Sequence, residues 1–277
     1  MKDTFIKNIS LFFFLFILLI MAVGCEKSNK KTKSSITKEE AYNIYCDTIK
    51  KFVPELIDKT SLPECDINIT TRDEVTFLTE HFIRNTTVNI KSKNVDGKLQ
   101  YYLLNEFPEA NKINFYCINN DRFYSISCES NKKGTLEQQP SSNINSFIFP
   151  YLNTPLFPQD AISSFESKKK NSDIEVTFIV KGDGTDYGYG YRVMSEILPN
   201  LQEDKLDDIK IILTIDKDGV PKTMSTELSM SILNKSTGNL HAKKKLNMNF
   251  RFNKFDNVDF DISNIISQYA LDFSCFK

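Results

Sequence analysis

Side chains that could act in catalysis are few in this chain, and their spacing matches no catalytic motif. The two histidines, His81 and His241, lie far apart in the sequence and belong to no metal-binding pattern such as HExxH. No Gly-x-Ser-x-Gly nucleophile turn and no Walker phosphate loop occurs. An isolated histidine is more often an ordinary surface or core residue than a ligand. The sequence therefore predicts a protein that is not an enzyme and that holds no metal and no cofactor.

The sequence around one cysteine indicates a covalent modification. Cys25 follows the net-positive start with Lys2 and Lys7, the unbroken apolar run of residues 11–23, and Gly24. That run is shorter than the roughly 20 residues of a membrane-spanning helix and is typical of the apolar region of a secretory signal peptide. Residues 22–25, Ala-Val-Gly-Cys, resemble a bacterial lipobox, although leucine is usual where Ala22 stands. In a lipobox the cysteine receives a diacylglyceryl group and becomes the first residue. An ordinary signal peptide is the alternative.

Lipidation at Cys25 would define both the organisation and the location of the chain. Residues 1–24 would form the lipoprotein signal peptide, residues 25–35 a polar, basic tether, and residues 36–277 a single domain. Because two or more acyl chains hold a protein stably on a bilayer, we expect a lipid-anchored protein at the extracytoplasmic face of the cell membrane. The net charge of −1 provides no strongly basic domain, which argues against nucleic-acid binding.

The remaining five cysteines include no CxxC pair, and their odd number excludes complete pairing within the chain. If Asn120-Asp121 is a two-residue hairpin turn, Cys117 faces Tyr124 and Cys128 faces Ile113, which places the two sulfurs too far apart for a disulfide. A disulfide between Cys46 and Cys65 stays possible. The favoured interpretation is that the cysteines are buried as small apolar residues. The state of the whole set therefore stays open: Cys46, Cys65, Cys117, Cys128 and Cys275.

The region after residue 36 begins with the clearest predicted helix. Thr37 and Glu40 have the spacing of a capping box, in which each side chain binds the backbone N–H of the other residue. A single apolar stripe follows at helical spacing. Its members are Ala41, Ile44, Tyr45, Ile49 and Phe52.

From residue 66 the pattern changes to β-branched and aromatic runs, separated by turn residues such as Asp96-Gly97. The segment Asp73–Arg84 is ambiguous, and Asn131–Ser142 is predicted to be a polar loop. Short helices are predicted at Ile144–Phe149, Asp160–Phe165 and Tyr191–Leu198. Strands are predicted at Asp66–Thr71, Thr86–Ser92, Leu99–Phe107, Lys112–Asn119, Arg122–Cys128, Ile174–Lys181, Asp208–Ile215, Lys222–Leu233 and Leu240–Phe255.

Apolar and polar residues alternate in the last strands, which predicts a sheet with one buried and one solvated face. Ile211, Leu213 and Ile215 show the alternation clearly. Lys243 and Lys245 are expected on one face and Lys244 on the other. The acidic groups and lysine runs among these strands are interpreted as part of the solvated surface. They include Asp207, Asp208, Asp256, Asp259, Asp261 and Lys168–Lys170.

A stretch rich in glycine and tyrosine, residues 182–191, is the most unusual local pattern. It contains four of the nine glycines and alternates Tyr187, Tyr189 and Tyr191, but it has neither the spacing of a dinucleotide-binding loop nor the acidic periodicity of a calcium loop. A functional interpretation makes it an aromatic lip at the mouth of a cavity, because tyrosine has an apolar body and a polar tip. A plain connecting loop is the simpler interpretation.

The order of these segments resembles the LolA/LppX-like lipoproteins, here in a branch of low-GC Gram-positive type. The sequence LTIDKDGVPKTMSTELSMSI, followed by KKKLNMNFRFNKFDNVDFDI, carries most of the resemblance, with an acidic-glycine turn at Asp216–Gly219 and a tail at Phe255–Ile262. The resemblance spans roughly Thr37 to Ile262. It implies an α+β fold in which a strongly curved antiparallel half-barrel sheet has helices covering its concave face. It also implies a ligand cavity between those layers and supplies no catalytic residues.

Together these observations favour a membrane-anchored, non-enzymatic lipoprotein that binds a lipid or another hydrophobic ligand in the half-barrel. Methionine and phenylalanine suit an adaptable apolar pocket, although they suit an ordinary core equally well. The alternative is a signalling or scaffold lipoprotein that docks a membrane-protein partner in the envelope; an envelope hydrolase lacks a nucleophile–base pair. Candidate ligand-binding residues are Tyr187, Tyr189, Tyr191, Leu213, Met224, Leu228, Met248 and Phe250, with Ile211 and Phe252 beside them.

Overall fold

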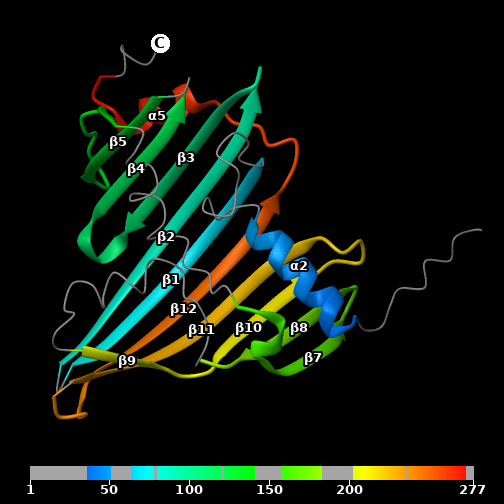
Figure 1. Cartoon of the computed structure of the whole chain (residues 1–277). Helices are drawn as coiled ribbons and strands as arrows, with labels where there is room; N and C mark the ends of the chain where they lie inside the picture. The colour runs from blue at the N-terminus through cyan, green and yellow to red at the C-terminus, as the bar shows by residue number, and fades with distance from the viewer. Residues whose placement is uncertain are drawn as a thin grey trace, which may run out of the picture. The chain divides into compact units, whose positions relative to one another are not determined.

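The computed structural model describes residues 36–50, 64–77, 80–119, 122–140, 157–182, 202–234 and 236–272, without the side chains of residues 202–205 and 241. Within these ranges the chain forms one 12-stranded antiparallel sheet and two α-helices (Figure 1). Residues 1–35, which contain the predicted signal peptide, tether and Cys25, lie outside the described ranges. No helix among the described residues is long and apolar enough to cross a membrane.

The sheet has two halves, β1–β6 and β7–β12, which are joined where β1 pairs with β12. The path of hydrogen-bonded neighbours is β6-β5-β4-β3-β2-β1-β12-β11-β10-β8-β7, and β9 pairs with β11 beside this path. The first strand of the domain therefore pairs with the last one. The bounds are β1 Cys65–Phe77, β2 Glu80–Val95, β3 Lys98–Phe107, β4 Lys112–Asn119, β5 Arg122–Glu129, β6 Glu137–Gln139, β7 Ile162–Lys170, β8 Asp173–Val180, β9 Gln202–Leu206, β10 Ile209–Ile215, β11 Pro221–Asn234 and β12 Leu240–Lys254.

The sequence predicts most of these strands well because their turns have clear chemistry. Asp96 and Gly97 both adopt positive φ and join β2 to β3, as a two-residue hairpin turn requires. The Asp216 carboxylate accepts hydrogen bonds from the backbone N–H groups of Asp218 and Val220, which closes the turn before β11. In the ambiguous segment Asp73–Arg84, residues 73–77 belong to β1 and residues 80–84 to β2, and the pairing of the two strands extends to Phe77 and Glu80.

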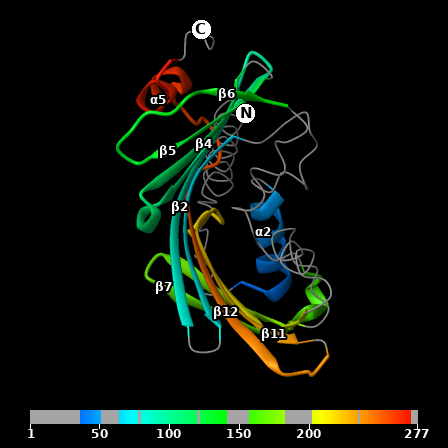
Figure 2. The ribbon, with the colours of Figure 1, turned by 90° about the vertical axis from the view of Figure 1, so that its left-hand side faces the viewer.

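Side chains alternate between the two faces of the sheet and form a separate apolar cluster on each. We call the first the α2 face, because its cluster includes Ala41, Tyr45 and Ile49 of helix α2, Lys38–Lys50. On β3, for example, Leu103 belongs to this cluster and Leu104 to the cluster on the opposite face. The α2 face is apolar from β5 to β7 along the order of paired strands, whereas the opposite face is apolar only at β3–β5 among the described strands. Helix α5, Ile262–Tyr269, covers the opposite face there (Figure 2).

Helix α2 begins with the predicted capping box. Glu40 N donates to Thr37 Oγ1 at 3.2 Å, and Thr37 N donates to Glu40 Oε2 at 2.9 Å. The buried ring of Tyr45 lies 5.0 Å from that of Phe157 and 6.1 Å from that of Phe178 on β8, measured between centroids. These aromatic contacts dock the helix against the β7–β8 end of the sheet.

Helix α5 is absent from the sequence-based expectations. Its N-cap is Asp261, whose carboxylate accepts from Ser263 N at 2.9 Å and Asn264 N at 3.2 Å. Ile266 is fully buried, and the Tyr269 ring stacks on Phe115 of β4 at 5.6 Å. The helix thus seals the second apolar cluster.

The expected half-barrel with helices over its concave face is wrong. The sheet is open, and the two described helices lie on opposite faces near opposite ends: α2 at β7–β8 and α5 at β3–β5 (Figures 1 and 2). The physical reason is that β3, β4 and β5 are apolar on both faces, so each face requires its own cover.

Two further local predictions differ from the structure. Asp160–Phe165 is not a helix: a single 3₁₀ turn at Gln159–Ala161 leads directly into β7, which pairs with β8. The loop predicted at Asn131–Ser142 contains the short strand β6. The helices predicted at Ile144–Phe149 and Tyr191–Leu198 lie outside the described residues.

The expected hairpin register is confirmed. Cys117 pairs with Tyr124, and Cys128 pairs with Ile113, so the two cysteines are not opposite each other. Both are free, as are Cys46 and Cys65. Cys275 lies outside the described residues.

Candidate ligand-binding face

Five of the predicted ligand-binding residues come together on the α2 face. Neighbouring strands place Leu213 opposite Met224, and Met224 opposite Phe250. Leu228 and Met248 lie on the same face, and all five side chains are buried within the larger apolar cluster. Tyr187, Tyr189 and Tyr191 lie outside the described residues, so their predicted place at a cavity mouth stays a prediction.

This apolar face contains a charged group that the sequence patterns did not indicate. Asp73 of β1 is 7% exposed, and its Oδ2 lies 2.8 Å from Arg84 Nη2 and 3.3 Å from Lys244 Nζ. Lys244 is largely shielded, whereas Lys243 and Lys245 are exposed, as their alternation predicts. A buried carboxylate requires such partners, because an unpaired charge in an apolar environment is costly. The α2 face is therefore amphipathic rather than wholly apolar.

Several buried polar atoms of the α2 face have no hydrogen-bond partner among the described residues. They are Asp73 Oδ1, Tyr101 OH, both amide atoms of Asn105, and Thr226 Oγ1. Thr226 lies between two apolar residues, Ile211 on β10 and Met248 on β12. All five such atoms among the described residues lie on this one face. The signal in the sequence is a threonine at a position where the alternation predicts an apolar residue.

The end of the α2 face near β3 holds a small group of buried weak acids. Cys65 Sγ lies 3.2 Å from Ser92 Oγ, and burial raises the pKa of the Cys65 thiol to about 11. Burial also raises the pKa of the Tyr101 phenol well above its usual value. Both groups are therefore neutral at physiological pH and contribute dipoles rather than charge.

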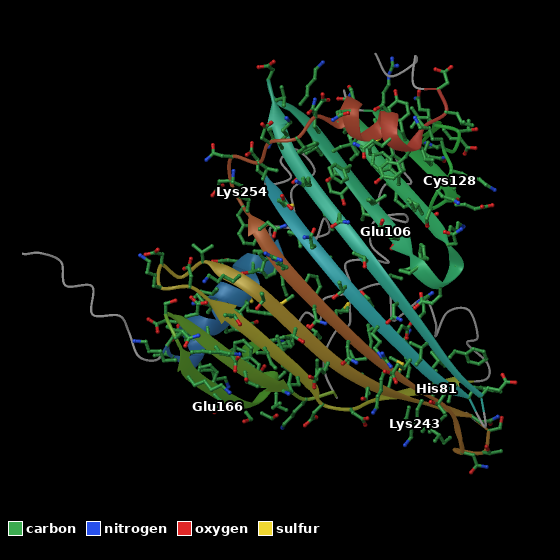
Figure 3. All side chains as sticks on the ribbon, turned by 180° about the vertical axis from the view of Figure 1, so that it is seen from behind. His81, Glu106, Cys128, Glu166, Lys243 and Lys254 are labelled. Carbon is green, nitrogen blue, oxygen red and sulfur yellow. The ribbon has the colours of Figure 1, made fainter. Side chains whose placement is uncertain are left out.

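The other residues considered for chemistry lie on the exterior. His81 is exposed, and its Nδ1 lies 3.0 Å from Thr76 Oγ1. Figure 3 shows His81 and Lys243 at the same end of the sheet. The acidic residues and Lys168–Lys170, interpreted as solvated from the sequence, are exposed. Within the described ranges, no three His, Cys, Asp or Glu side chains are arranged to hold a metal ion.

Comparisons with known proteins give only distant likenesses. No protein-family model and no curated protein matches the chain. A DUF1329 family protein from Desulfovibrio piger is 9% identical with a TM-score of 0.28, over 82% of this chain and 96% of the other. A putative outer membrane lipoprotein-sorting protein domain from Vibrio parahaemolyticus is 12% identical with a TM-score of 0.28, over 83% and 97%. A LolA superfamily protein from Nitrosomonas europaea is 9% identical with a TM-score of 0.26, over 79% and 96%. These structures include the superfamily that the sequence resembles, but likenesses this distant assign neither a family nor a function.

Proposed function

We propose that this protein is a lipid-anchored envelope lipoprotein that binds an amphipathic ligand, such as a lipid, against the α2 face, and that it is not an enzyme. The observation that supports this most is that several buried polar atoms of this largely apolar face have no partner in the part of the chain that the structure describes. In a closed core nearly all buried polar groups have partners, and each unsatisfied one costs roughly 1–3 kcal/mol. A bound amphiphile would offset that cost with its own polar groups.

The ligand that fits has an acyl or other apolar part and at least one hydrogen-bonding group. The methionines and phenylalanines of β11 and β12 provide an adaptable apolar surface, including Met224, Met248 and Phe250. Thr226 Oγ1 provides a hydroxyl beside them. Asp73 with Arg84 provides charged partners for a head group, because the guanidinium is 64% exposed and has further N–H groups to donate.

The experiment that tests this function uses the full chain, purified from a bacterial envelope in mild detergent. Native mass spectrometry and lipid extraction should find a lipid in roughly one-to-one ratio with protein. Thr226→Val removes the unpartnered hydroxyl at nearly constant volume, so we expect it to lower lipid occupancy without unfolding the protein. Ser229→Ala, on the opposite face of the same strand, is the matched control. A lipid-free mass that envelope lipids do not change would contradict the proposal.

Anchoring is a separate part of the proposal and has its own test. A diacylglyceryl group on Cys25 would hold the protein on the extracytoplasmic side of the cell membrane, with residues 25–35 as tether and residues 36–277 as domain. Cys25→Ser should release the protein from the membrane fraction, and the wild-type N-terminal peptide should carry the lipid mass. Retention of the variant in the membrane would refute the anchor.

A second candidate function, docking of a membrane-protein partner, is supported by exposed apolar side chains at the end of the sheet where Phe77 of β1 pairs with Glu80 of β2. Phe82 is 56% exposed, Ile83 is 41% exposed, and Leu240 of the neighbouring hairpin is 49% exposed. Crosslinking in intact cells should then recover one dominant protein, and Phe82→Ser should abolish its capture. Equal capture by wild type and variant would exclude this surface.

A further inference from the structure

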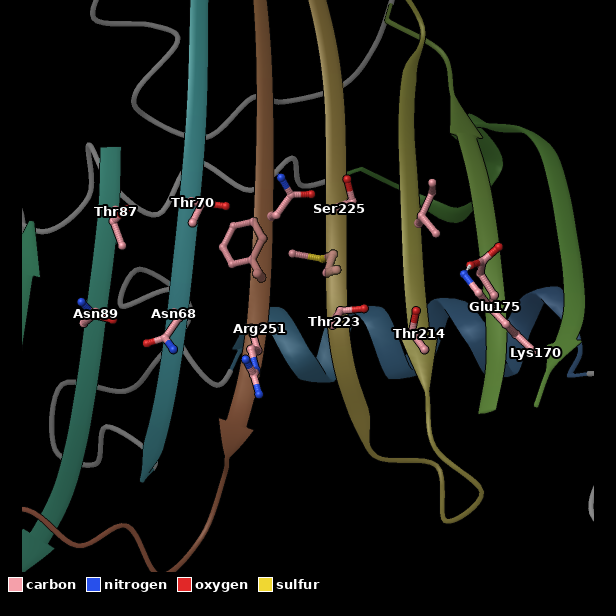
Figure 4. Close-up of a pocket in the computed structure, with 14 residues that line it drawn as sticks. Asn68, Thr70, Thr87, Asn89, Lys170, Glu175, Thr214, Thr223, Ser225 and Arg251 are labelled. Atoms are coloured by element: carbon pink, nitrogen blue, oxygen red, sulfur yellow. Dashed lines mark hydrogen bonds and ion pairs between the residues drawn. The ribbon is translucent and has the colours of Figure 1, made fainter. Parts of the chain in front are cut away.

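A pocket of about 630 Å³ lies on the face of the sheet opposite α2 (Figure 4). Its lining also includes Met224 and Phe250, which belong to the apolar cluster of the α2 face. The pocket extends across strands β2, β1, β12, β11, β10, β8 and β7. Its volume falls in the usual range of small-molecule sites, roughly 300–1,000 Å³. We call it the polar pocket, because amide and hydroxyl side chains make up most of its lining.

The strand register arranges these side chains in two adjacent rows that run perpendicular to the strands. One row holds Asn89, Asn68, Arg251, Thr223, Thr214 and Glu175, each from the next strand. The row beside it includes Thr70, Asn249 and Ser225 on the central strands. Neighbouring groups in a row are about 4.8 Å apart, the spacing between strands. The pocket therefore presents a regular array of groups that both donate and accept hydrogen bonds.

The array contains fewer charged side chains than the surface around it. On the same face, the next row towards one end holds Asp66 and Lys91, which form an ion pair at 2.9 Å. The next row towards the other end holds Arg72 and Glu227. Charged residues make up 26% of the chain, yet they are nearly absent from the central part of the two rows. A purely solubilising surface has no need to confine its charges in this way.

Arg251 is the one charged group at the centre of the array. It is exposed, and no carboxylate or other acceptor among the described residues binds its guanidinium. The other charges of the pocket are already matched: Glu175 lies 2.8 Å from Lys170 and 3.0 Å from Lys168. None of the amide and hydroxyl side chains named above forms a hydrogen bond with another described residue. The groups that a ligand needs are thus available.

We propose that the polar pocket binds an anionic saccharide. Sugar hydroxyls both donate and accept hydrogen bonds, as do the asparagine, threonine and serine side chains of the two rows. A planar carboxylate on the sugar pairs with Arg251, whose guanidinium binds such a group through two parallel N–H donors. The site lies on the opposite face from the proposed lipid surface, so it neither requires nor replaces that function.

The test uses the full chain in detergent and three soluble probes followed by isothermal titration calorimetry. Tetragalacturonate is a sugar chain with carboxylates, chitotetraose is a neutral sugar chain, and oligo(glycerol phosphate) is an anionic chain without sugar rings. Arg251→Gln removes the charge, and Lys245→Gln removes a charge from the same strand and face outside the pocket. We expect tetragalacturonate to bind at least about tenfold more tightly than either other probe. Its affinity should fall by about tenfold or more in Arg251→Gln and stay within twofold in Lys245→Gln.

The other outcomes overturn the proposal in different ways. Equal affinity for chitotetraose would remove the anionic requirement, and preference for oligo(glycerol phosphate) would replace the saccharide with a polyol phosphate. Equal losses in the two variants would show nonspecific attraction, and no binding of any probe would leave the pocket without this role. An unchanged melting temperature of Arg251→Gln establishes that a loss of binding does not come from unfolding.

Discussion

Asp73 Oδ2 accepts a hydrogen bond from Arg84 Nη2 at 2.8 Å, while Oδ1 of the same buried carboxylate has no partner among the described residues. The two residues face each other across β1 and β2 on the α2 face. One oxygen is therefore satisfied by the protein and the other is available to a ligand. This half-satisfied carboxylate links the stability of the sheet to its proposed binding role.

Asp73→Ala should destabilise the protein by about 1–3 kcal/mol, because it removes the buried carboxylate that pairs with Arg84 and with the largely shielded Lys244. Urea unfolding followed by circular dichroism measures the change. Glu74→Gln is the control, since Glu74 pairs with Arg72 on the exposed face of the same strand. It should have a smaller effect. Equal losses from the two substitutions would show that the buried position of Asp73 adds nothing to stability.

The buried thiols should resist alkylation. Only the thiolate reacts, and burial raises the pKa of Cys65 to about 11 and also raises that of Cys117. Iodoacetamide at pH 8 should therefore modify the half-buried Cys46 and Cys128 before these two. Peptide mass mapping measures the order, and labelling of all four in urea is the control. Native labelling of Cys65 as fast as that of Cys128 would refute the packing described for β1.

The contribution of Glu175 to stability should depend on pH. Hydrogen bonds from Lys170 first and then Lys168 hold the pKa of Glu175 below its ordinary value of 4.5. A lowered folded-state pKa means that the stabilisation is present above the unfolded pKa and is lost as pH falls through the folded one. Glu175→Gln should therefore cost up to about 1 kcal/mol at pH 7, because the group lies near the surface.

Wild type and Glu175→Gln should then become equally stable as the pH drops below the lowered pKa of Glu175. Glu166→Gln, an exposed residue on the neighbouring strand, serves as control and should show a weaker pH dependence. Thermal unfolding measured from pH 7 down to pH 3 distinguishes the two variants. A difference between wild type and Glu175→Gln that stays constant over this range would contradict the assignment.

Local sequence patterns were sufficient to predict the helix and the strands that are bounded by clear capping or turn residues. The strand predicted at Lys112–Asn119 has the observed bounds, and the Thr37–Glu40 capping box forms as predicted. The first residues of β7 fall in the helix predicted at Asp160–Phe165, because this serine- and lysine-rich segment has few β-branched residues. Pairing with β8 determines its extended conformation. Helix α5 was missed because its polar start, although capped by Asp261, resembled a tail.

Residues of the candidate sites could be predicted only where the alternation of apolar and polar residues along a strand shows which face each side chain occupies. Strand periodicity placed Leu213, Met224 and Phe250 on one face, and they are there. Asp73 was not identified, because its position depends on the long-range pairing of β1 with β12. The same pairing creates the polar pocket, whose rows join residues from the two ends of the domain. No local pattern in the sequence contains that information.

The most direct test of the central claim is photocrosslinking of the full chain with a phospholipid that carries a diazirine in its acyl chain. We predict that tryptic peptides of β11 and β12 are labelled at α2-face residues, Met224 and Met248 foremost, and that Thr226→Val reduces this labelling relative to Ser229→Ala. Labelling confined to Phe82 and Ile83, or to the face opposite α2, would contradict the account.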